Sequence, residues 1–260
     1  MAITAGIDAG AKNTKVIILR EDEIVGRGTN PTGFDQSDAV EKAFVMALEE
    51  AGITREQVDR IVATGAGRKA VHLAQGNVTE VTADARGANR LMPSARTVID
   101  VGAEEGRGIS VDERGVLVDS AVNEKCAAGA GAFTEAMARA LEIPLEDIGE
   151  LSLQSTKSID MNAQCTVFAE SELVTLVHSN TATADIARSV HDAISSRITS
   201  MVRRVGLEPD VMLIGGVGYN VGFKKSLEED LGMGVTVPEY PEYVTALGAA
   251  IIAKEQLGGA

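Results

Sequence analysis

Two Asp-x-Gly turns are the clearest candidates for chemistry in this sequence. A DAG turn at 8–10 ends the apolar segment 3–8, and a DVG turn at 100–102 ends the similar segment 95–100. One such motif alone is more often only a turn, but two copies after two alike segments favour a shared role. Carboxylates at strand ends suit hydrated magnesium, because this ion prefers oxygen ligands and keeps several waters. Asp8 and Asp100 are therefore predicted to hold Mg²⁺.

The glycines beside these carboxylates indicate that phosphate oxygens can approach the backbone closely. Gly10 and Gly102 let backbone N–H groups reach an anion, and the pair Gly215-Gly216, between a predicted strand and a predicted helix, suits an adenosine moiety. The side chains that add donors beside the first turn are Lys12, Asn13, Thr14 and Lys15. Neither GxxxxGK followed by Ser or Thr nor a GxGxxG after the first strand occurs, which excludes a P-loop and a dinucleotide fingerprint.

The two cysteines form a second group of candidate ligands. Cys126 in EKCAAGAGAF and Cys165 in AQCTVFAESE each precede a predicted helix, where the helix dipole favours the thiolate. Either cysteine alone is more often a small buried apolar residue. An iron–sulfur cluster usually takes four thiolates, so a symmetric pair of chains supplies one complete site and the count predicts a dimer. Zinc held by four thiolates satisfies the same count.

Composition bounds the class of protein. The chain has 260 residues, 45% of them hydrophobic, and a formal net charge of −14. This length suits two domains, and the negative charge argues against nucleic acid or an anionic membrane as a partner. No apolar run is long enough to cross a membrane and no basic leader opens the chain, so a cytoplasmic location is expected.

Periodicity predicts an α/β protein built from two similar halves. Strands are predicted at 3–8, 14–20, 23–28 and 60–64, and again at 95–100, 106–111, 116–121, 210–214 and 235–237. Helices are predicted at about 39–51, with Ser37 or Asp38 as the N-cap and Gly52 as the stop, and at 126–141, 166–178, 183–205, 220–231 and 243–257. His72, His178 and His191 lack the spacing of metal ligands and are interpreted as surface or core residues.

The Asp and Gly motifs resemble those of the actin-like ATPase superfamily, which includes sugar kinases, actin and the Hsp chaperones. The resemblance implies two ribonuclease-H-like lobes that clamp ATP. We expect the first lobe at 1–94, joined by the C-terminal helix 243–260, and the second, which carries both cysteines, at 95–242. It also implies that Asp8 and Asp100 position the attacking water, with help from Glu104, and that the glycine turns bind the nucleotide.

An ordered set of further motifs is similar to one family within that fold. GIDAG at 6–10, DVG at 100–102, KCAAGAGAF at 125–133, CTVFAESE at 165–172, GGVGYN at 215–220 and ALGAA at 246–250 resemble the ATPase subunits of benzoyl-CoA reductase and the activators of 2-hydroxyacyl-CoA dehydratases. The resemblance adds Asn220 and Gly248 to the nucleotide site. It implies a dimer bridged by one 4Fe-4S cluster on Cys126 and Cys165, in which ATP hydrolysis drives a low-potential electron, from a donor such as ferredoxin, into a CoA-ester reductase or dehydratase.

The segment after the second Asp-x-Gly turn points to one branch of that family. Dehydratase activators typically continue it as Gly-Gln-Asp, whereas this chain has Ala103-Glu104-Glu105. The chain therefore looks more like a benzoyl-CoA reductase small ATPase subunit, whose partner in the dimer is a related but different chain, so both a homodimer and a heterodimer stay open. The alternatives are a dehydratase activator, a sugar kinase without a cluster, and a noncatalytic nucleotide switch.

Overall fold

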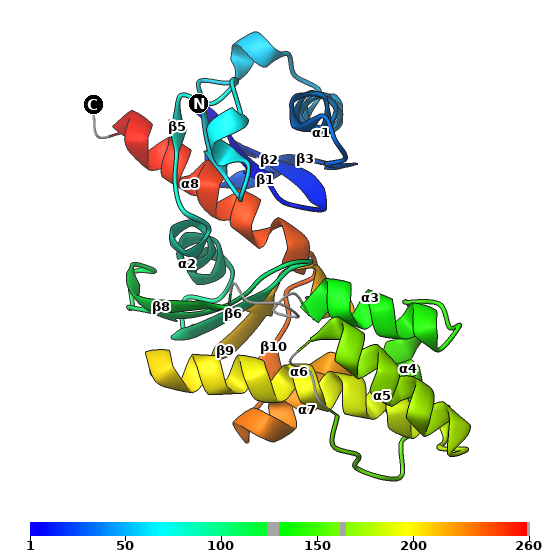
Figure 1. Ribbon diagram of the computed structural model, residues 1–260. Coiled ribbons are helices and arrows are strands. Elements are labelled where there is room, and N and C mark those ends of the chain that lie inside the picture. Colours follow the sequence, from blue (N-terminus) through cyan, green and yellow to red (C-terminus); the bar gives the residue numbers. More distant parts are fainter. Residues whose placement is uncertain (124–129, 162–164, 259–260) are drawn as a thin grey trace. The chain divides into compact units, whose positions relative to one another are not determined.

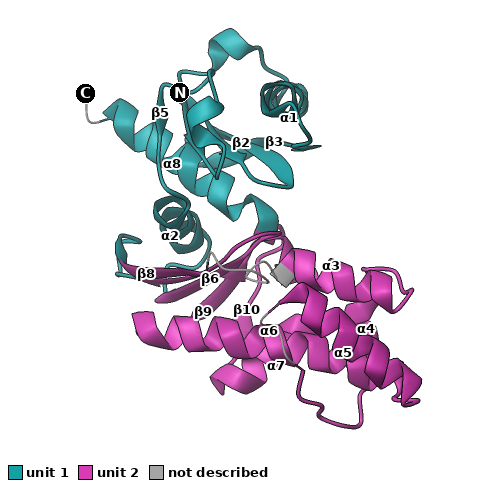
Figure 2. Cartoon of the chain, in the orientation of Figure 1, with its two compact units in different colours: residues 1–95, 111–118, 242–260 teal, residues 96–110, 119–241 magenta. Residues whose placement is uncertain are grey.

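A computed structural model describes residues 1–123, 130–161 and 165–258. The chain divides into two compact units, which Figure 2 colours separately. The first unit comprises Met1–Ala95, Val111–Val118 and Glu242–Ala260, and the second comprises Arg96–Ser110 and Asp119–Pro241. Among the described helices, none combines the length and the apolar content that a membrane crossing needs.

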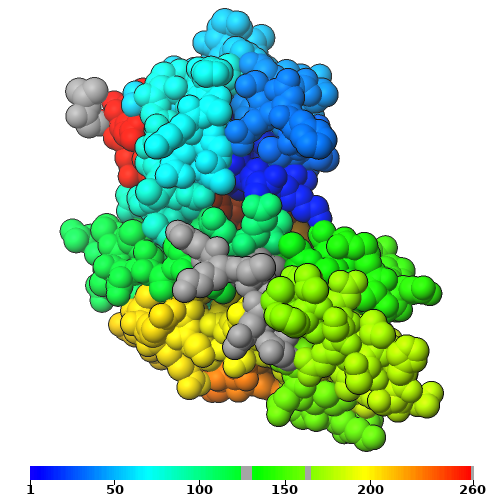
Figure 3. Space-filling model, in the orientation of Figure 1, coloured from blue at the N-terminus to red at the C-terminus, as the bar shows by residue number. Residues whose placement is uncertain are grey.

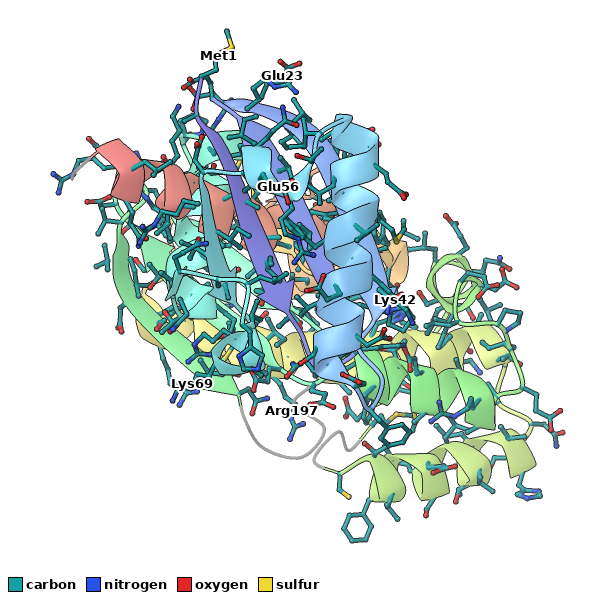
Figure 4. The ribbon with its side chains drawn as sticks, turned by 90° about the horizontal axis from the view of Figure 1, so that it is seen from above. Met1, Glu23, Lys42, Glu56, Lys69 and Arg197 are labelled. Atoms are coloured by element: carbon teal, nitrogen blue, oxygen red, sulfur yellow. The ribbon has the colours of Figure 1, made fainter. Side chains whose placement is uncertain are left out.

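The first unit contains a five-stranded sheet in the order β3-β2-β1-β4-β5. Its strands are β1 (Ile3–Ala9), β2 (Asn13–Arg20), β3 (Glu23–Pro31), β4 (Arg60–Thr64) and β5 (Gly76–Asn77). β1, β2 and β3 form antiparallel neighbours, and β4 joins β1 in parallel. Met1, which precedes β1, and Glu23, which begins β3, accordingly lie at the same end of the sheet (Figure 4). The predicted strands at 3–8, 14–20, 23–28 and 60–64 are confirmed.

Two helices cover opposite faces of this sheet because successive side chains of a strand point to opposite faces. Val16 and Ile18 of β2 share a buried cluster with residues of α1, whereas Ile17 and Leu19 share one with residues of α8. The helices of the unit are α1 (Gln36–Ala51), α2 (Glu80–Leu91) and α8 (Val244–Gly258), with the short helices η1 (Arg55–Gln57) and η2 (Arg68–Ala70), and η4 (Pro241–Tyr243) leads into α8.

The two ends of α1 test the predicted capping residues. Gly52 ends the helix in the left-handed region, with φ 63°, which confirms the predicted stop. The predicted N-cap was wrong. Asp35 is the N-cap, and its side chain accepts a hydrogen bond from the backbone N–H of Asp38 at 3.0 Å. The helix begins before Ser37 because Asp35 already satisfies a free N–H group of the first turn.

Helix α2 is absent from the sequence-based prediction because its buried face consists of small residues. The buried positions are Ala83, Asp84, Ala85, Gly87 and Ala88, none of which is a large apolar residue. These residues let α2 and α8 pack with their backbones in contact. A Cβ at Gly87 would lie 2.2 Å from the carbonyl oxygen of Val244, and a Cβ at Gly248 would lie 1.8 Å from that of Ala83. Both glycines are therefore required by helix packing.

We expect the Gly248→Ala substitution to destabilise the protein strongly. The added methyl group meets the backbone carbonyl of Ala83, which cannot move without separating α2 from α8, so the free energy of unfolding should fall by roughly 3 kcal/mol. Gly258→Ala is the matched control, because it lies in the same helix and its Cβ would meet nothing within 4 Å. Urea denaturation followed by circular dichroism measures both. Equal stability of the two variants would contradict the close packing.

The second unit repeats the arrangement of the first sheet. Its order is β10-β9-β6-β7-β8, with β6 antiparallel to β7 and parallel to β9. The strands are β6 (Thr97–Val101), β7 (Gly106–Val111), β8 (Leu117–Asn123), β9 (Val211–Ile214) and β10 (Val235–Thr236). In each sheet the central strand therefore has an antiparallel neighbour from the following segment and a parallel neighbour from much later in the chain. The structural repeat predicted from the sequence is confirmed at the level of the sheets.

Helices gather on one side of the second sheet, where α6 runs along the strands (Figure 1). The helices are α3 (Ala130–Ala140), α4 (Ile148–Ser152), α5 (Thr166–His178), α6 (Thr183–Val205), η3 (Gly216–Tyr219) and α7 (Val221–Leu231). The bounds of α5 and α6 match the prediction. The main core of the unit includes Ile99 of β6, Leu213 of β9, Val190 of α6 and Phe223 of α7. This core fixes the ends of β6 and β9, which carry the candidate site residues.

Candidate functional site

Asp8 lies at the end of β1 in a nearly buried ion pair. Its register partner on β2 is Lys15, and the Lys15 Nζ lies 3.1 Å from the Asp8 Oδ2. The side chains are only 9% and 18% exposed, so the pair is largely removed from water. The hairpin thus brings together two residues that the sequence predicted separately, one as a magnesium ligand and one as a phosphate donor.

A glycine that directly follows the neighbouring parallel strand also contacts Asp8. Gly65 follows Thr64, the register partner of Asp8 on β4, and has φ 91°. A Cβ at Gly65 would lie 2.6 Å from the Asp8 Oδ1, so only glycine leaves room for the carboxylate. Arg68 donates a hydrogen bond to the Gly65 carbonyl at 2.9 Å and fixes the turn. No sequence motif assigned Gly65 to the site. Its position directly after a predicted strand could have indicated it.

The loop after Asp8 is held from inside by two threonines. The Thr32 hydroxyl donates to the Gly10 carbonyl at 2.8 Å, and the Thr32 N–H donates to the Lys12 carbonyl at 2.9 Å. Thr14 is fully buried, with its hydroxyl 3.2 Å from that of Thr32. The Thr14 side chain therefore supports the loop from below, and its phosphate contact stays a prediction. Lys12 is exposed and Asn13 half-buried at the tip of the loop.

The second unit carries the same constellation at the end of β6. Arg107 is the register partner of Asp100 on β7, and its guanidinium pairs with the Asp100 carboxylate and with Glu105. Gly215 follows Ile214, the register partner of Asp100 on β9, and has φ 85°. A Cβ at Gly215 would lie 2.6 Å from the Asp100 Oδ1. Sequence motifs do not mark Arg107, yet it corresponds to Lys15 in the first unit.

Each unit thus presents a strand-end carboxylate, a basic residue opposite it on the antiparallel strand, and a positive-φ glycine on the parallel strand. Oxygen donors of this kind fit Mg²⁺. A Cβ at Gly102 would meet no atom closer than 3.6 Å and a Cβ at Gly216 none within 4 Å, whereas a Cβ at Gly10 would lie 2.7 Å from the Asn13 carbonyl oxygen. The described residues therefore fit a magnesium–nucleotide complex in their chemistry.

The turn after Asp100 is joined to the start of α3. The N–H of Gly131 donates to the Gly102 carbonyl at 3.2 Å, and the N–H of Ala132 donates to the Ala103 carbonyl at 2.9 Å. A Cβ at Gly131 would lie 2.9 Å from the Ala103 Cα, so the two segments are in backbone contact. Glu104 is exposed within this turn and touches none of these bonds.

Asn220 and Gly248 occupy structural positions. The Asn220 side chain caps α7, with its Oδ1 accepting from the N–H of Phe223 at 2.9 Å. Asn220 also ends the turn that begins at Gly215, since its own N–H donates to the Val217 carbonyl at 2.9 Å. Gly248 is buried between α8 and α2, and this packing accounts for its lack of a side chain. The nucleotide role of both residues stays a prediction.

Cys165 is the N-cap residue of α5, in extended conformation and half-buried. The helix therefore begins directly after this cysteine, as predicted. Cys126 lies outside the described residues. Within the described parts of the chain, no group of three or more His, Cys, Asp or Glu residues could hold a metal ion. Two thiols per chain are half of a four-thiolate set, so a cluster fits this protein only between two chains.

The outer side of α5 exposes four large apolar side chains among polar ones. Val167 and Phe168 are 66% and 68% exposed, and Val174 and Val177 are also exposed. The helix contributes to the molecular surface in Figure 3, where its side chains are yellow-green. Exposed apolar side chains gathered on one helix are typical of a surface that a partner covers.

Similarity to known proteins extends over nearly the whole chain. The profile of the BadF/BadG/BcrA/BcrD ATPase family matches residues 5–253. The activator of lactoyl-CoA dehydratase from Anaerotignum propionicum is 37% identical over 97% of both chains. One of the subunits of benzoyl-CoA reductase from Thauera aromatica is 34% identical over 96% of this chain and 93% of its own.

Solved structures show the fold. Component A of the Acidaminococcus fermentans (R)-2-hydroxyglutaryl-CoA dehydratase has a TM-score of 0.95 at 35% identity, covering 99% of this chain and 100% of its own. A ROK family glucokinase from Streptomyces griseus has a TM-score of 0.61 at 15% identity, covering 98% of this chain and all of its own, which shows a shared fold alone. The predicted α/β fold of the actin-like ATPase superfamily is confirmed.

Proposed function

The chain belongs to the BadF/BadG/BcrA/BcrD ATPase family, and from this premise we propose that it hydrolyses ATP to send low-potential electrons through a shared iron–sulfur cluster into a partner enzyme. One observation carries the proposal: the turn beside Asp100 is hydrogen-bonded to the start of α3, and α3 follows the segment that contains Cys126. The predicted nucleotide turn at Gly102 is therefore hydrogen-bonded to the helix that follows the predicted cluster residue Cys126 along the chain.

Hydrolysis is assigned to the two strand-end carboxylates. Asp8 and Asp100 would hold magnesium and position the attacking water, while Lys12, Asn13 and Thr14 would bind phosphate. The backbone N–H groups near Gly10 and Gly102 would stabilise the developing negative charge. Magnesium, bound with ATP, supplies neutralisation of the phosphate oxygens. The basic residues Lys15 and Arg107 keep both carboxylates oriented, because each is fixed opposite its partner by strand register.

Nucleotide binding is coupled to the cluster through the backbone contacts of α3. A nucleotide that binds the turn at Gly102 shifts the equilibrium of the chain only if it favours one position of that turn over another. Such a shift is passed to α3 through the bonds from Gly131 and Ala132. α3 also packs against α5, which begins at Cys165. α3, and through it the start of α5 at Cys165, therefore responds to the same turn.

The cluster is assigned to a dimer in which each chain gives Cys126 and Cys165. The exposed Val167 and Phe168 of α5, beside Cys165, support burial of this region in an assembly. Both types of partner enzyme named among the relatives act in CoA-ester chemistry, one as a dehydratase and one as a reductase. The Ala103-Glu104-Glu105 segment favours benzoyl-CoA reductase, with ring reduction as the final reaction. A donor such as ferredoxin would supply the electrons.

Oxygen-free purification tests this function directly. We expect a brown dimer with about four irons and four sulfides per two chains, and ATP hydrolysis by the same preparation. Light scattering, iron and sulfide assays and phosphate release provide the measurements. A monomer without iron would refute the electron-transfer function, and zinc in place of iron would refute the cluster while keeping the dimer. Addition of benzoyl-CoA reductase or of dehydratase catalytic subunits then identifies which partner receives electrons.

A further inference from the structure

His191 lies at the centre of a buried hydrogen-bond chain in the second unit. It is fully buried on α6, and its Nδ1 lies 3.0 Å from the hydroxyl oxygen of Ser152 on α4. Its Nε2 lies 3.0 Å from the Nδ2 of Asn220, which caps α7. The imidazole therefore joins three helices through two side-chain bonds.

The neighbouring bonds fix the direction of every donor in this chain. The Ser152 hydroxyl donates to the Gly149 carbonyl at 2.7 Å, so its oxygen accepts from His191 Nδ1–H. The Asn220 Oδ1 accepts from the Phe223 N–H, so its Nδ2 donates to His191 Nε2. A neutral imidazole has one donor and one acceptor nitrogen, and only the tautomer with the proton on Nδ1 satisfies both contacts.

The surroundings keep this imidazole neutral. Burial, and then the charge of Arg188, lowers the pKa of His191 to about 3. The junction is also closely packed, because a Cβ at Gly222 would lie 2.1 Å from the Ser152 hydroxyl oxygen and 2.7 Å from the His191 Nδ1. Nε2 therefore stays an acceptor, since a proton there would face the Asn220 amide protons.

We infer that His191 is a positioning residue for the turn that begins at Gly215, the predicted adenosine subsite. Its Nε2 accepts a hydrogen bond from the Asn220 side-chain amide. This bond holds Asn220, which ends the turn and caps α7. The inference rests on the proposed adenosine subsite at this turn. If the amide rotated, its oxygen would leave the Phe223 N–H, and the cap of α7 and the end of the turn would loosen together. Asp8 and Asp100 are not part of this chain of bonds, so the effect falls on nucleotide binding.

The tautomer can be observed without any nucleotide. The protein has only three histidines, and His72 and His178 are exposed. In long-range ¹H–¹⁵N spectra of the full chain, the imidazole of His191 should remain neutral with its proton on Nδ1 from pH 5 to pH 8. Titration of this imidazole in that range, or a proton on its Nε2, overturns the inference.

Kinetic variants test the positioning role. We expect His191→Leu to raise the KM for ATP about tenfold, the effect of one lost hydrogen bond, with kcat within about twofold. His191→Gln keeps an acceptor toward Asn220 and should recover most of the affinity. His72→Gln, the same change at an exposed site, should match the wild type. Equal KM values for all variants, or a loss confined to kcat, overturn the inference.

A second variant covers the case in which His191→Leu does not fold. Asn220→Asp keeps an oxygen that accepts from the Phe223 N–H but offers no donor to His191. The pKa of His191 should then rise beside the new carboxylate, and its imidazole should begin to titrate. An imidazole that still does not titrate in this variant contradicts the assigned contact. Failure of the wild-type protein to bind ATP would instead refute the proposed function, and the tautomer assignment would stand.

Discussion

The Asp100→Asn variant is expected to lose ATP hydrolysis by at least about 100-fold, while the protein stays folded. The substitution keeps the size of the side chain and removes the negative charge that faces the predicted magnesium and water. The Arg107 guanidinium keeps Glu105 as a partner, so the buried cation is not left alone. Phosphate release under saturating ATP and Mg²⁺ measures the loss, and a fluorescent nucleotide reports binding separately.

Two matched variants show whether the effect belongs to the site. Asp8→Asn removes the equivalent carboxylate of the first unit and should also cost about 100-fold, because Asp8 occupies the same register position opposite Lys15. Asp119→Asn, at an exposed position of β8, should leave turnover unchanged. Turnover that survives in both Asp100→Asn and Asp8→Asn would remove the two carboxylates from the proposed mechanism.

The Cys165→Ser variant should lose the cluster and the dimer together. A serine hydroxyl is a poor ligand for iron, and the remaining thiols of two chains number only two. We expect iron, sulfide and visible absorption to fall to background in oxygen-free preparations. ATP hydrolysis should continue, because Cys165 lies outside the groups of residues around Asp8 and Asp100, whereas electron delivery to the partner enzyme should stop.

The control for this variant is Thr166→Ser, an equally small change at the first residue of α5. It should retain iron, because the helix start and the thiol are both preserved. Cys126→Ser should repeat the loss seen for Cys165→Ser, since each chain is assigned two ligands. Full iron content in either cysteine variant would contradict the assignment of that residue and would require the ligands to be sought elsewhere.

The two similar groups of residues around Asp8 and Asp100 show how a common local pattern can become part of a site. An Asp at a strand end is common, but here strand register places a cation seven positions later opposite each Asp, as Lys15 in one unit and Arg107 in the other. Removal of one partner from an ion pair this well shielded lowers the stability of the fold, because the other charge remains buried. The Ala103-Glu104-Glu105 departure is accommodated without disturbing this pair, and Glu105 adds a second carboxylate to Arg107.

Local sequence determined many of the elements and the candidate ligands of this protein, although not helix α2. Strands at 3–8 and 95–100, the helices at 166–178 and 183–205, and the stop at Gly52 could be predicted because apolar periodicity and a left-handed glycine act within a few residues. The Asp-x-Gly pair and the two cysteines could be singled out for the same reason. Their residue types already carry the chemistry.

Tertiary structure alone decided which residues meet. Gly65 and Gly215 matter because strands from distant segments bring them against a carboxylate, and Gly248 matters because α2 packs on α8. His191 has no motif, yet three helices converge on it. Such contacts depend on register and helix packing between segments far apart in the chain, and a local pattern contains no information about either.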